Sequence, residues 1–273
     1  MATQEFAESI SNLSISLALI SLFFLLLLEK KRPKLLFPKT VSKQSVFTNF
    51  SAFLFNNIVL TLIRATSLFF VAQEFAGNGL LSGMQEGPLK WTLTFLIYDF
   101  AIYLWHVINH QNEFLWRFHK VHHSDQAFNV TTGFRFHVID LLIEIPYKCL
   151  FVITIGVDAH IVLAMEAIQF LFILFHHSNI EIPNEEKISR YLITPSLHRA
   201  HHSASRSEHD SNYGIVFSLW DRVFGTRLEV VPQIIGLEII IAENFIQLFC
   251  IGLLTENNFR RVLKIIPNGR RKH

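Results

Sequence analysis

The sequence predicts an all-α integral membrane protein, with about four to five membrane-embedded helices, including a helical hairpin, and a cytoplasmic, histidine-rich helical cap. Of its 273 residues, 51% are hydrophobic and 17% are charged, whereas soluble domains carry roughly 25% charged residues. The mean hydropathy is +0.34. Apolar runs of helical length alternate with short polar segments that hold most of the 14 histidines. The net charge of +2 gives no indication of nucleic-acid binding.

The first 90 residues are predicted to form the N-terminal transmembrane helices. Residues 11–28 are uncharged and long enough to span a bilayer. The basic stretch EKKRPK at 29–34 follows and is predicted to stay in the cytoplasm. A second span is expected over about 46–72, interrupted by Arg64. The loop 73–90 is rich in glycine and poor in lysine and arginine, so we expect it on the opposite side of the membrane.

Residues 91–230 are predicted to form a second region. A third helix is expected over 89–111, and a hairpin over 139–157 and 159–177 that turns near Gly156. The segments 112–138 and 180–230 are too polar to span a membrane. With the N-terminus outside, every histidine cluster lies on the cytoplasmic side. The tail, 231–273, is predicted to be an amphipathic segment whose basic end lies near anionic lipid.

The histidines recur at helical spacing. An H-x-x-x-H pattern begins at His106, and an H-x-x-H-H pattern occurs twice, so each set lies on one face of a helix. Neutral imidazole is a common ligand of iron and zinc, and a tetrahedral site takes about four ligands, so this number of histidines indicates two metal ions. The candidate ligands are His106, His110, His119, His122, His123, His176, His177, His198, His201 and His202, with His137 as either a ligand or a neighbour of the ligands.

The order of the motifs resembles the fatty acid hydroxylase / sterol desaturase superfamily over about 95–226. The motifs that carry the resemblance are D-x-x-x-Y-x-x-H-x-x-x-H at 99–110, LWRFHKVHHSD at 115–125, NVTTGFRFH at 129–137, HSN at 177–179, PSLHRAHH at 195–202, NYG at 212–214 and WDRVFGT at 220–226. The resemblance implies that 91–230 is a catalytic domain of this type. The family's H-x-N setting fits His177 through Asn179, which ranks His177 above His176.

The resemblance further implies a membrane-bound non-haem di-iron oxidoreductase that uses O2 to hydroxylate or desaturate a lipid. The cofactors would be two Fe ions, with zinc as a substitute metal, and all the candidate ligands except His137 and His176 would also be catalytic residues. The chain carries no flavin, NAD or haem-domain motif, so electrons are expected from a separate donor protein. A bacterial inner membrane or endoplasmic reticulum location fits this class. Sterol, fatty acyl, sphingolipid and ether lipid substrates all stay open.

Several other side chains are expected to support the site. Ligating histidines usually donate their second ring N–H to an acceptor. Among the remaining histidines, His160 is expected at the membrane interface and His209 in solvent. An apolar approach for the substrate is expected beside three phenylalanines of the second hairpin arm, Phe170, Phe172 and Phe175. The candidate hydrogen-bond partners for the second ring nitrogen of the histidines are Asp99, Asp125, Asp210, Asn179, Asn212 and Tyr103.

Two alternatives compete with an enzyme. A membrane haem protein would place isolated histidines deep in facing spans, whereas these histidines are clustered at one membrane surface. A non-catalytic metal-binding or transport protein would carry polar residues along its spans at mid-depth, and the first two spans are nearly bare of them.

Overall fold

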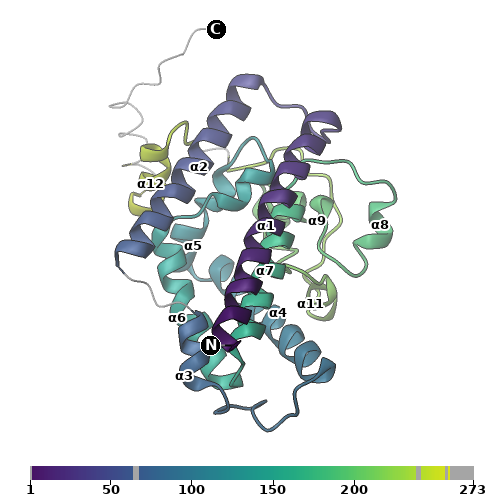
Figure 1. The fold of residues 1–273 in the computed structure, drawn as a ribbon. Helices are drawn as coiled ribbons and strands as arrows, with labels where there is room; N and C mark the ends of the chain where they lie inside the picture. The colour runs from purple at the N-terminus through teal and green to yellow at the C-terminus, as the bar shows by residue number, and fades with distance from the viewer. Residues whose placement is uncertain (1, 64–67, 238–240, 256–257, 259–273) are drawn as a thin grey trace.

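The computed structural model describes residues 2–63, 68–237, 241–255 and 258, with side chains from residue 13 onward. The described residues form helices joined by loops, with isolated β-bridges and no strand. Figure 1 shows the long helices running along the molecule, with the short helices α8, α9 and α11 on one side of it and α12 on the other. Four helices are long and apolar enough to cross a membrane, as predicted: α1 (Ala2–Lys31), α2 (Lys39–Leu62), α4 (Pro88–Gln111) and α7 (Ala159–His176).

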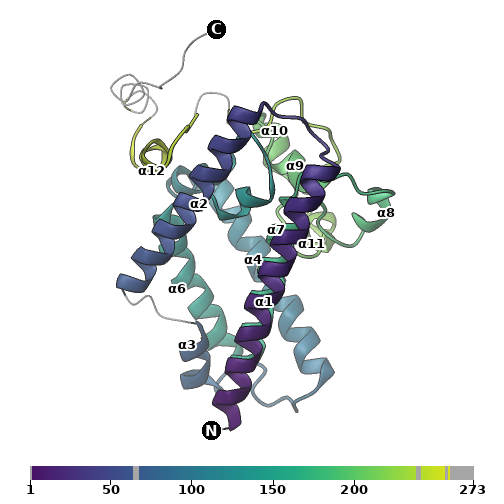
Figure 2. The same ribbon diagram turned by 45° about the horizontal axis from the view of Figure 1, so that its top comes forward.

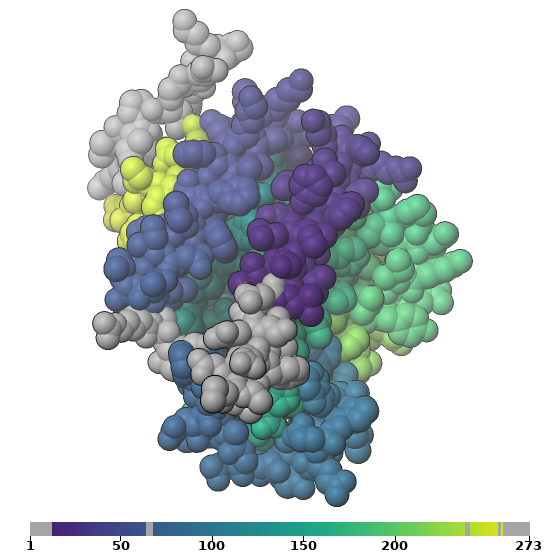
Figure 3. Space-filling model, viewed as in Figure 1, coloured from purple at the N-terminus to yellow at the C-terminus, as the bar shows by residue number. Residues whose placement is uncertain are grey.

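The helix α1 has the character of a lipid-facing span. It packs along α7, and its remaining apolar side chains are exposed: Leu19, Phe23 and Phe24 keep 63%, 60% and 58% of their surface. Figure 3 shows α1 standing on the surface of the molecule. Apolar surface of this extent is typical of contact with lipid and not with water.

The prediction of one continuous span over 46–72 is wrong. The helix α2 begins at Lys39, after Pro38, and ends at Leu62, and a separate short helix, α3 (Leu68–Phe75), follows. The two helices pack against different parts of the molecule. The helix α2 packs mainly on the segment 130–134, and α3 packs on the two helices of the hairpin, where Ala72 is completely buried. Arg64 lies outside the described residues.

The helical hairpin is confirmed. Its arms are α6 (Val138–Ile155) and α7, and Gly156 joins them with a φ of +70°, a conformation that glycine adopts without steric cost. The backbone of Gly79 lies so close that a Cβ on either glycine would overlap the other. Leu80 and Leu81 also donate backbone hydrogen bonds to the carbonyls of residues 154 and 155. The loop 73–90 therefore lies at the turn of the hairpin.

The cap lies at the opposite end of the helices. The C-terminal ends of α4 and α7 and the N-terminal end of α6 meet there, because the hairpin turn occupies the other end. Figure 2 shows α9, α10 and α12 together at one end and α3 at the other. The cap consists of α5 (Glu113–His119), η1 (His122–Ser124), η2 (Val130–Phe134), α8 (Glu185–Ile188), α9 (Pro195–His201), α10 (Arg206–His209) and α11 (Leu219–Val223).

One described helix belongs to the tail predicted as an amphipathic surface segment. This helix, α12 (Phe245–Leu253), packs on α5 and α2, where Leu248 and Ile251 bury against Val121 and Ala52. The basic residues 260–272 lie outside the described residues. In its described part, the tail is therefore held to the cap by apolar packing.

A buried polar network fixes the cap to α2. The Asp125 carboxylate accepts hydrogen bonds from Ser45 and Asn49 of α2 and from Thr132 of η2. The Arg135 guanidinium donates to the Asn49 side-chain oxygen and to Ser124. Because the Asp125 and Arg135 side chains are buried and both bind Asn49, this network fixes the loop that follows the first H-x-x-H-H motif.

Candidate metal centre

The structure gathers nine of the predicted histidines into two buried groups. In each group the ligand atoms all lie within 4.8 Å of one another. The first group has five members and the second has four, and the two groups lie side by side, since the rings of His123 and His202 stack at 4.5 Å. The first group is His106, His110, His119, His123 and His201, and the second is His122, His177, His198 and His202.

Each H-x-x-H-H motif divides its histidines between the two groups. In the first motif, His122 and His123 are adjacent in the 3-10 turn η1, so their side chains diverge into different groups. In the second, His198 and His202 are one helical turn apart and join the second group, whereas His201 joins the first. The repeated motif thus supplies both groups, and it holds them at a fixed separation.

Hydrogen bonds to Nδ1 fix the ring orientation in the first group. His106 donates to the Tyr213 carbonyl over 2.8 Å, and His201 donates to the Ser211 carbonyl over 2.6 Å. Two carboxylates serve in the same way for two further rings: Asp210 accepts from His110 at 3.2 Å, and Asp140 accepts from His119 at 3.1 Å. The fifth ring, that of His123, has no partner on either nitrogen among the described residues. A ring that donates through Nδ1 presents its Nε2 lone pair to a metal. The Nε2 atoms of His110, His119 and His201 are buried without a partner among the described residues.

The second group brings Nε2 atoms almost into contact. The Nε2 of His177 lies 3.0 Å from that of His122 and 2.9 Å from that of His198, which in turn lies 3.2 Å from the Nε2 of His202. His177 donates through Nδ1 to the Ile173 carbonyl, so its Nε2 carries a lone pair. The Nδ1 atoms of His122, His198 and His202 are buried without a partner among the described residues, so no hydrogen bond there fixes the tautomer of these rings. With the proton on Nδ1, all four Nε2 lone pairs face one another, an arrangement that a cation between them stabilises. The donor set therefore fits a metal ion.

Burial keeps the grouped histidines in the neutral form that binds metal ions. Burial away from water lowers the pKa of His177 to about 3. It also holds the pKa of His122, His198 and His202 well below the usual value, with further lowering by neighbouring histidines. The rings are therefore neutral at pH 7, and a metal ion can bind without displacing protons. Nitrogen-only sites suit iron, zinc, copper and nickel.

Two predicted ligands lie outside both groups. His137 is the N-cap of α6: its Nδ1 accepts from the Ile139 N–H, and its Nε2 donates to the Phe249 carbonyl. With both nitrogens engaged, it acts in the structure as a helix cap. His176 donates through Nδ1 to the Ile215 carbonyl and packs against the ring of His198, with ring centres 3.9 Å apart.

The prediction that His209 is solvated is wrong. It is only 5% exposed, because the short helix α10 folds it onto Trp116, where the two rings stack at 5.1 Å. Its Nδ1 donates to the Ser203 carbonyl. His160 is half-buried at the start of α7 beside Trp91, at the end of the helix remote from the cap.

Of the acceptors predicted for the histidine rings, Asp210 is found in that role. The others hold loops around the site. Asp99 accepts from the backbone of Val216 and Phe217 and from the Trp220 indole. Among the described residues, the remaining candidates make no hydrogen bond to a histidine: Asp125 belongs to the Arg135 network, Asn179 binds the backbone of Leu35, Asn212 binds those of Leu197 and Leu228, and Tyr103 binds Thr226.

The acceptor that sequence reasoning missed is Asp140. A signal for it is present, since Asp140, Glu144 and Lys148 recur every four residues along α6 and so share one face. This polar stripe on an otherwise apolar helix predicts a functional surface there.

Replacing Asp140 by asparagine is expected to weaken metal binding by about 10–100-fold, because His119 would lose the charged acceptor that orients its ring. Competition between the purified protein and a chelator measures the change. Asp158→Asn is the matched control, since this aspartate pairs with Lys90 at the hairpin turn, at the end of the helices remote from the two histidine groups. Equal metal retention in the two variants would contradict the role given to Asp140.

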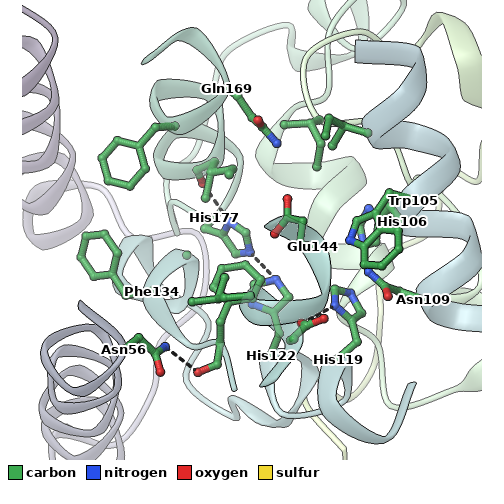
Figure 4. Close-up of a pocket in the computed structure, with 18 of the residues that line it drawn as sticks. Asn56, Trp105, His106, Asn109, His119, His122, Phe134, Glu144, Gln169 and His177 are labelled. Atoms are coloured by element: carbon green, nitrogen blue, oxygen red, sulfur yellow. Dashed lines mark hydrogen bonds and ion pairs between the residues drawn. The ribbon is translucent and has the colours of Figure 1, made fainter. Parts of the chain in front are cut away.

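The histidine groups open on a cavity of about 440 Å³ among the membrane helices, within the range of roughly 300–1,000 Å³ typical of small-ligand sites. Histidines of both groups form one end of it. Figure 4 shows His106, His119, His122 and His177 around this end. Much of the remaining wall is apolar and includes Leu60, Ile102, Phe134, Phe136, Phe170 and Ile173.

Comparison with known proteins agrees with this arrangement. Residues 91–226 match the model of the fatty acid hydroxylase family. The chain is 32% identical over 146 residues to an ornithine lipid hydroxylase of Rhizobium tropici, and the aligned region covers 51% of this chain and 44% of the relative. It is 27% identical over 224 residues to the alkylglycerol monooxygenase of Homo sapiens, covering 81% and 48%. A cholesterol 25-hydroxylase of Rattus norvegicus is 27% identical over 142 residues, covering 48% and 44%.

The chain spans about half the length of the curated relatives it matches, and no solved structure matches it. The matched region contains every member of both histidine groups. The family match and the curated relatives together identify the chain as a member of the fatty acid hydroxylase superfamily.

Proposed function

We propose that the protein is a membrane-bound, non-haem di-iron monooxygenase that uses O2 to hydroxylate or desaturate a C–H bond of a lipid. The observation that carries the proposal is the pair of adjacent all-histidine groups at the end of an apolar cavity among membrane helices. The names of the relatives support it, since they describe hydroxylases and monooxygenases.

The chain's own residues have distinct tasks in this proposal. The nine grouped histidines hold two iron ions, for which zinc can substitute, and iron when bound supplies the redox chemistry that activates O2. Asp140, Asp210 and the carbonyls of Tyr213, Ser211 and Ile173 keep the rings in the orientation that presents Nε2. The cap excludes water from the site, and the apolar cavity aligns the lipid chain with it.

The alternatives are less well supported. A haem needs two histidines on opposite faces of a broad planar ring, whereas the ligand atoms of four or five histidines here lie within 4.8 Å of one another. A protein that only stores or carries metal has no need of a cavity that leads from the metal groups into the membrane helices.

One of the three phenylalanines predicted to line the approach does so. Phe170 lines the cavity, whereas Phe172 packs against the core between α4 and the hairpin, and Phe175 packs on Phe172. Phe170→Asp is therefore expected to lower turnover by about tenfold or more while the metal content stays unchanged, because a carboxylate in the apolar wall opposes entry of the chain.

Turnover and metal content of purified Phe170→Asp measure this effect. Phe114→Asp is the control, because Phe114 is 61% exposed on the cap and lies outside the cavity wall. Loss of metal in Phe170→Asp would show that this wall supports the metal groups, and the access role would then be abandoned.

The side of the membrane that holds the active site is inferred from the distribution of basic residues. We place the cap and the active site on the cytoplasmic face of a bacterial inner membrane or an endoplasmic reticulum membrane, with electrons delivered there by a separate donor protein. The basic residues between α1 and α2 favour that side, because cytoplasmic loops carry an excess of lysine and arginine.

Cysteine labelling tests this topology. In a chain without Cys149 and Cys250, Leu80→Cys and Ser205→Cys are expected to react with an impermeant reagent from opposite sides of the membrane. Both positions are exposed, one in the loop 73–90 and the other in the cap. Labelling of both from the same side would contradict the predicted topology.

Lipid analysis tests the activity itself. Membranes of a host that makes the protein are expected to contain a new lipid, with one oxygen atom derived from labelled O2 if the product is hydroxylated and with an additional double bond if it is desaturated. This lipid should be absent when His201→Ala replaces the wild type. Identical lipid profiles in the two hosts would contradict the proposed function.

A further inference from the structure

The cavity has a polar wall remote from most of the grouped histidines. Lys148 of α6 forms ion pairs with Glu144, at 3.1 Å, and with Glu166 of α7, at 3.2 Å. The Tyr98 hydroxyl of α4 donates to Glu166 and lies 2.8 Å from the Gln169 side-chain oxygen. Four of these five residues line the cavity, the exception being Tyr98. We call this set the polar wall; the figure shows two of its members, Glu144 and Gln169.

Three helices place the polar wall at a consistent depth. Eight residues separate Tyr98 from His106 on α4, Gln169 from His177 on α7, and Lys148 from Asp140 on α6. At a rise of 1.5 Å per residue, each separation is about 12 Å along its helix. Glu144 lies midway, about 6 Å from the level of Asp140. The polar wall is therefore one to two helical turns deeper in the membrane region than the histidine groups.

The charges of the polar wall do not balance. Two carboxylates face one ammonium group, which leaves a net charge of −1. Glu166 accepts from both Tyr98 and Lys148. Glu144 pairs with Lys148 through Oε1, and its carboxylate points into the space between His177 and His106 in Figure 4. Among the residues that the structure describes, the second carboxylate oxygen of Glu144 has no hydrogen-bond partner, so the wall offers the cavity an acceptor.

Ionisable groups within membrane helices are costly, and they generally mark a functional site. A purely structural lysine needs one carboxylate, and Glu166 already supplies it. The second carboxylate, Glu144, lies on the cavity wall, on the same helical face as Asp140, which orients a grouped histidine. A role in holding the substrate accounts for both its excess charge and its position.

We propose that Glu144 accepts a hydrogen bond from a donor group on the lipid, a hydroxyl or an ammonium, and so positions the chain for oxidation at the histidine groups. The inference rests on the proposed function and narrows its substrate class: the substrate carries a hydrogen-bond donor roughly 6–12 Å from the site of reaction. Glu144 is then a positioning and specificity residue, with Lys148 and Glu166 holding it in place.

Binding of three probes tests this inference on the full-length, metal-loaded protein in detergent. The probes are an alkane, a primary alcohol and a primary amine of equal chain length, compared at equal mole fraction in the micelles. We expect the wild type to bind the alcohol, the amine or both on the order of tenfold or more tightly than the alkane. Thermal stabilisation by each probe gives the affinities without any need for turnover.

Glu144→Leu is expected to abolish this preference without changing the metal content, since Lys148 keeps its ion pair with Glu166. Glu144→Met, which keeps the length of the side chain, is the second variant if the first does not fold. Glu144→Gln separates the two donor groups, because an amide still accepts from a hydroxyl but lacks the charge that favours an ammonium. A preference for the alcohol should survive in it, and a preference for the amine should fall.

The chain supplies a matched control in Glu86→Leu. Glu86 pairs with Lys90 four residues away, and Lys90 also pairs with Asp158, which repeats the arrangement of Glu144, Lys148 and Glu166 at the far end of the helices. This variant should keep the wild-type preference. Equal binding of all three probes by the wild type, or a preference that survives in Glu144→Leu, overturns the inference. A preference that depends on Glu144, in a protein that oxidises no lipid, supports the inference and contradicts the proposed function.

Discussion

His122→Ala is expected to lose one of the two metal ions and all activity. His122 belongs to the group of four, so the variant leaves three ligands for that ion, whereas a tetrahedral site uses about four. His201→Ala leaves four ligands in the group of five, and its metal loss should be smaller. Both variants should lose turnover, because the proposed chemistry uses both ions.

Elemental analysis of the purified variants measures this difference. His160→Ala is the control, because His160 lies beside Trp91 at the opposite end of α7 from the histidine groups. It should keep the wild-type metal content. Full metal retention in both His122→Ala and His201→Ala would contradict the assignment of these histidines as metal ligands.

Arg135→Leu is expected to cost about 3–5 kcal/mol in the free energy of unfolding. Arg135 is 1% exposed. Removing its guanidinium leaves the buried Asp125 carboxylate without the nearby positive charge that favours its ionised form, and loss of one partner of a buried charge pair costs about this much. Asn49 would also lose a charged hydrogen-bond donor. Because this network joins the cap to α2, metal affinity should fall as well.

Chemical unfolding in detergent measures the loss. Arg206→Leu is the control, since the Arg206 side chain is 75% exposed in its ion pair with Asp210, and exposed pairs contribute about 0–1 kcal/mol. If the two variants have the same free energy of unfolding, the Arg135 network does not stabilise the cap.

Features that depend on local spacing could be predicted from the sequence. The hairpin could be placed because Gly156 interrupts two apolar stretches of helical length, and glycine supplies the positive φ of the turn. The histidines could be selected because ligand spacing repeats on short helices. Their division into two groups could not be, because His122 and His123 are neighbours in the chain and separate only through the geometry of η1.

The features that the sequence could not show depend on tertiary contacts. His137 follows the arginine and phenylalanine of a motif that resembles the family, but the start of α6 and the Phe249 carbonyl occupy both its nitrogens. Asp140 meets His119 because α6 folds back beside α5, which spacing along the chain does not reveal. The single span predicted over 46–72 had the right hydropathy, yet α2 and α3 pack on different parts of the molecule.

The most direct test of the central claim is the metal content and absorption spectrum of the wild-type protein, purified after growth with iron. We predict two iron ions per chain, one for each histidine group, and a spectrum without the Soret band of a haem. His122→Ala in the same preparation should lose at least one of them. A Soret band, or a wild type that contains a single metal ion whose amount does not change in His122→Ala, would contradict the account.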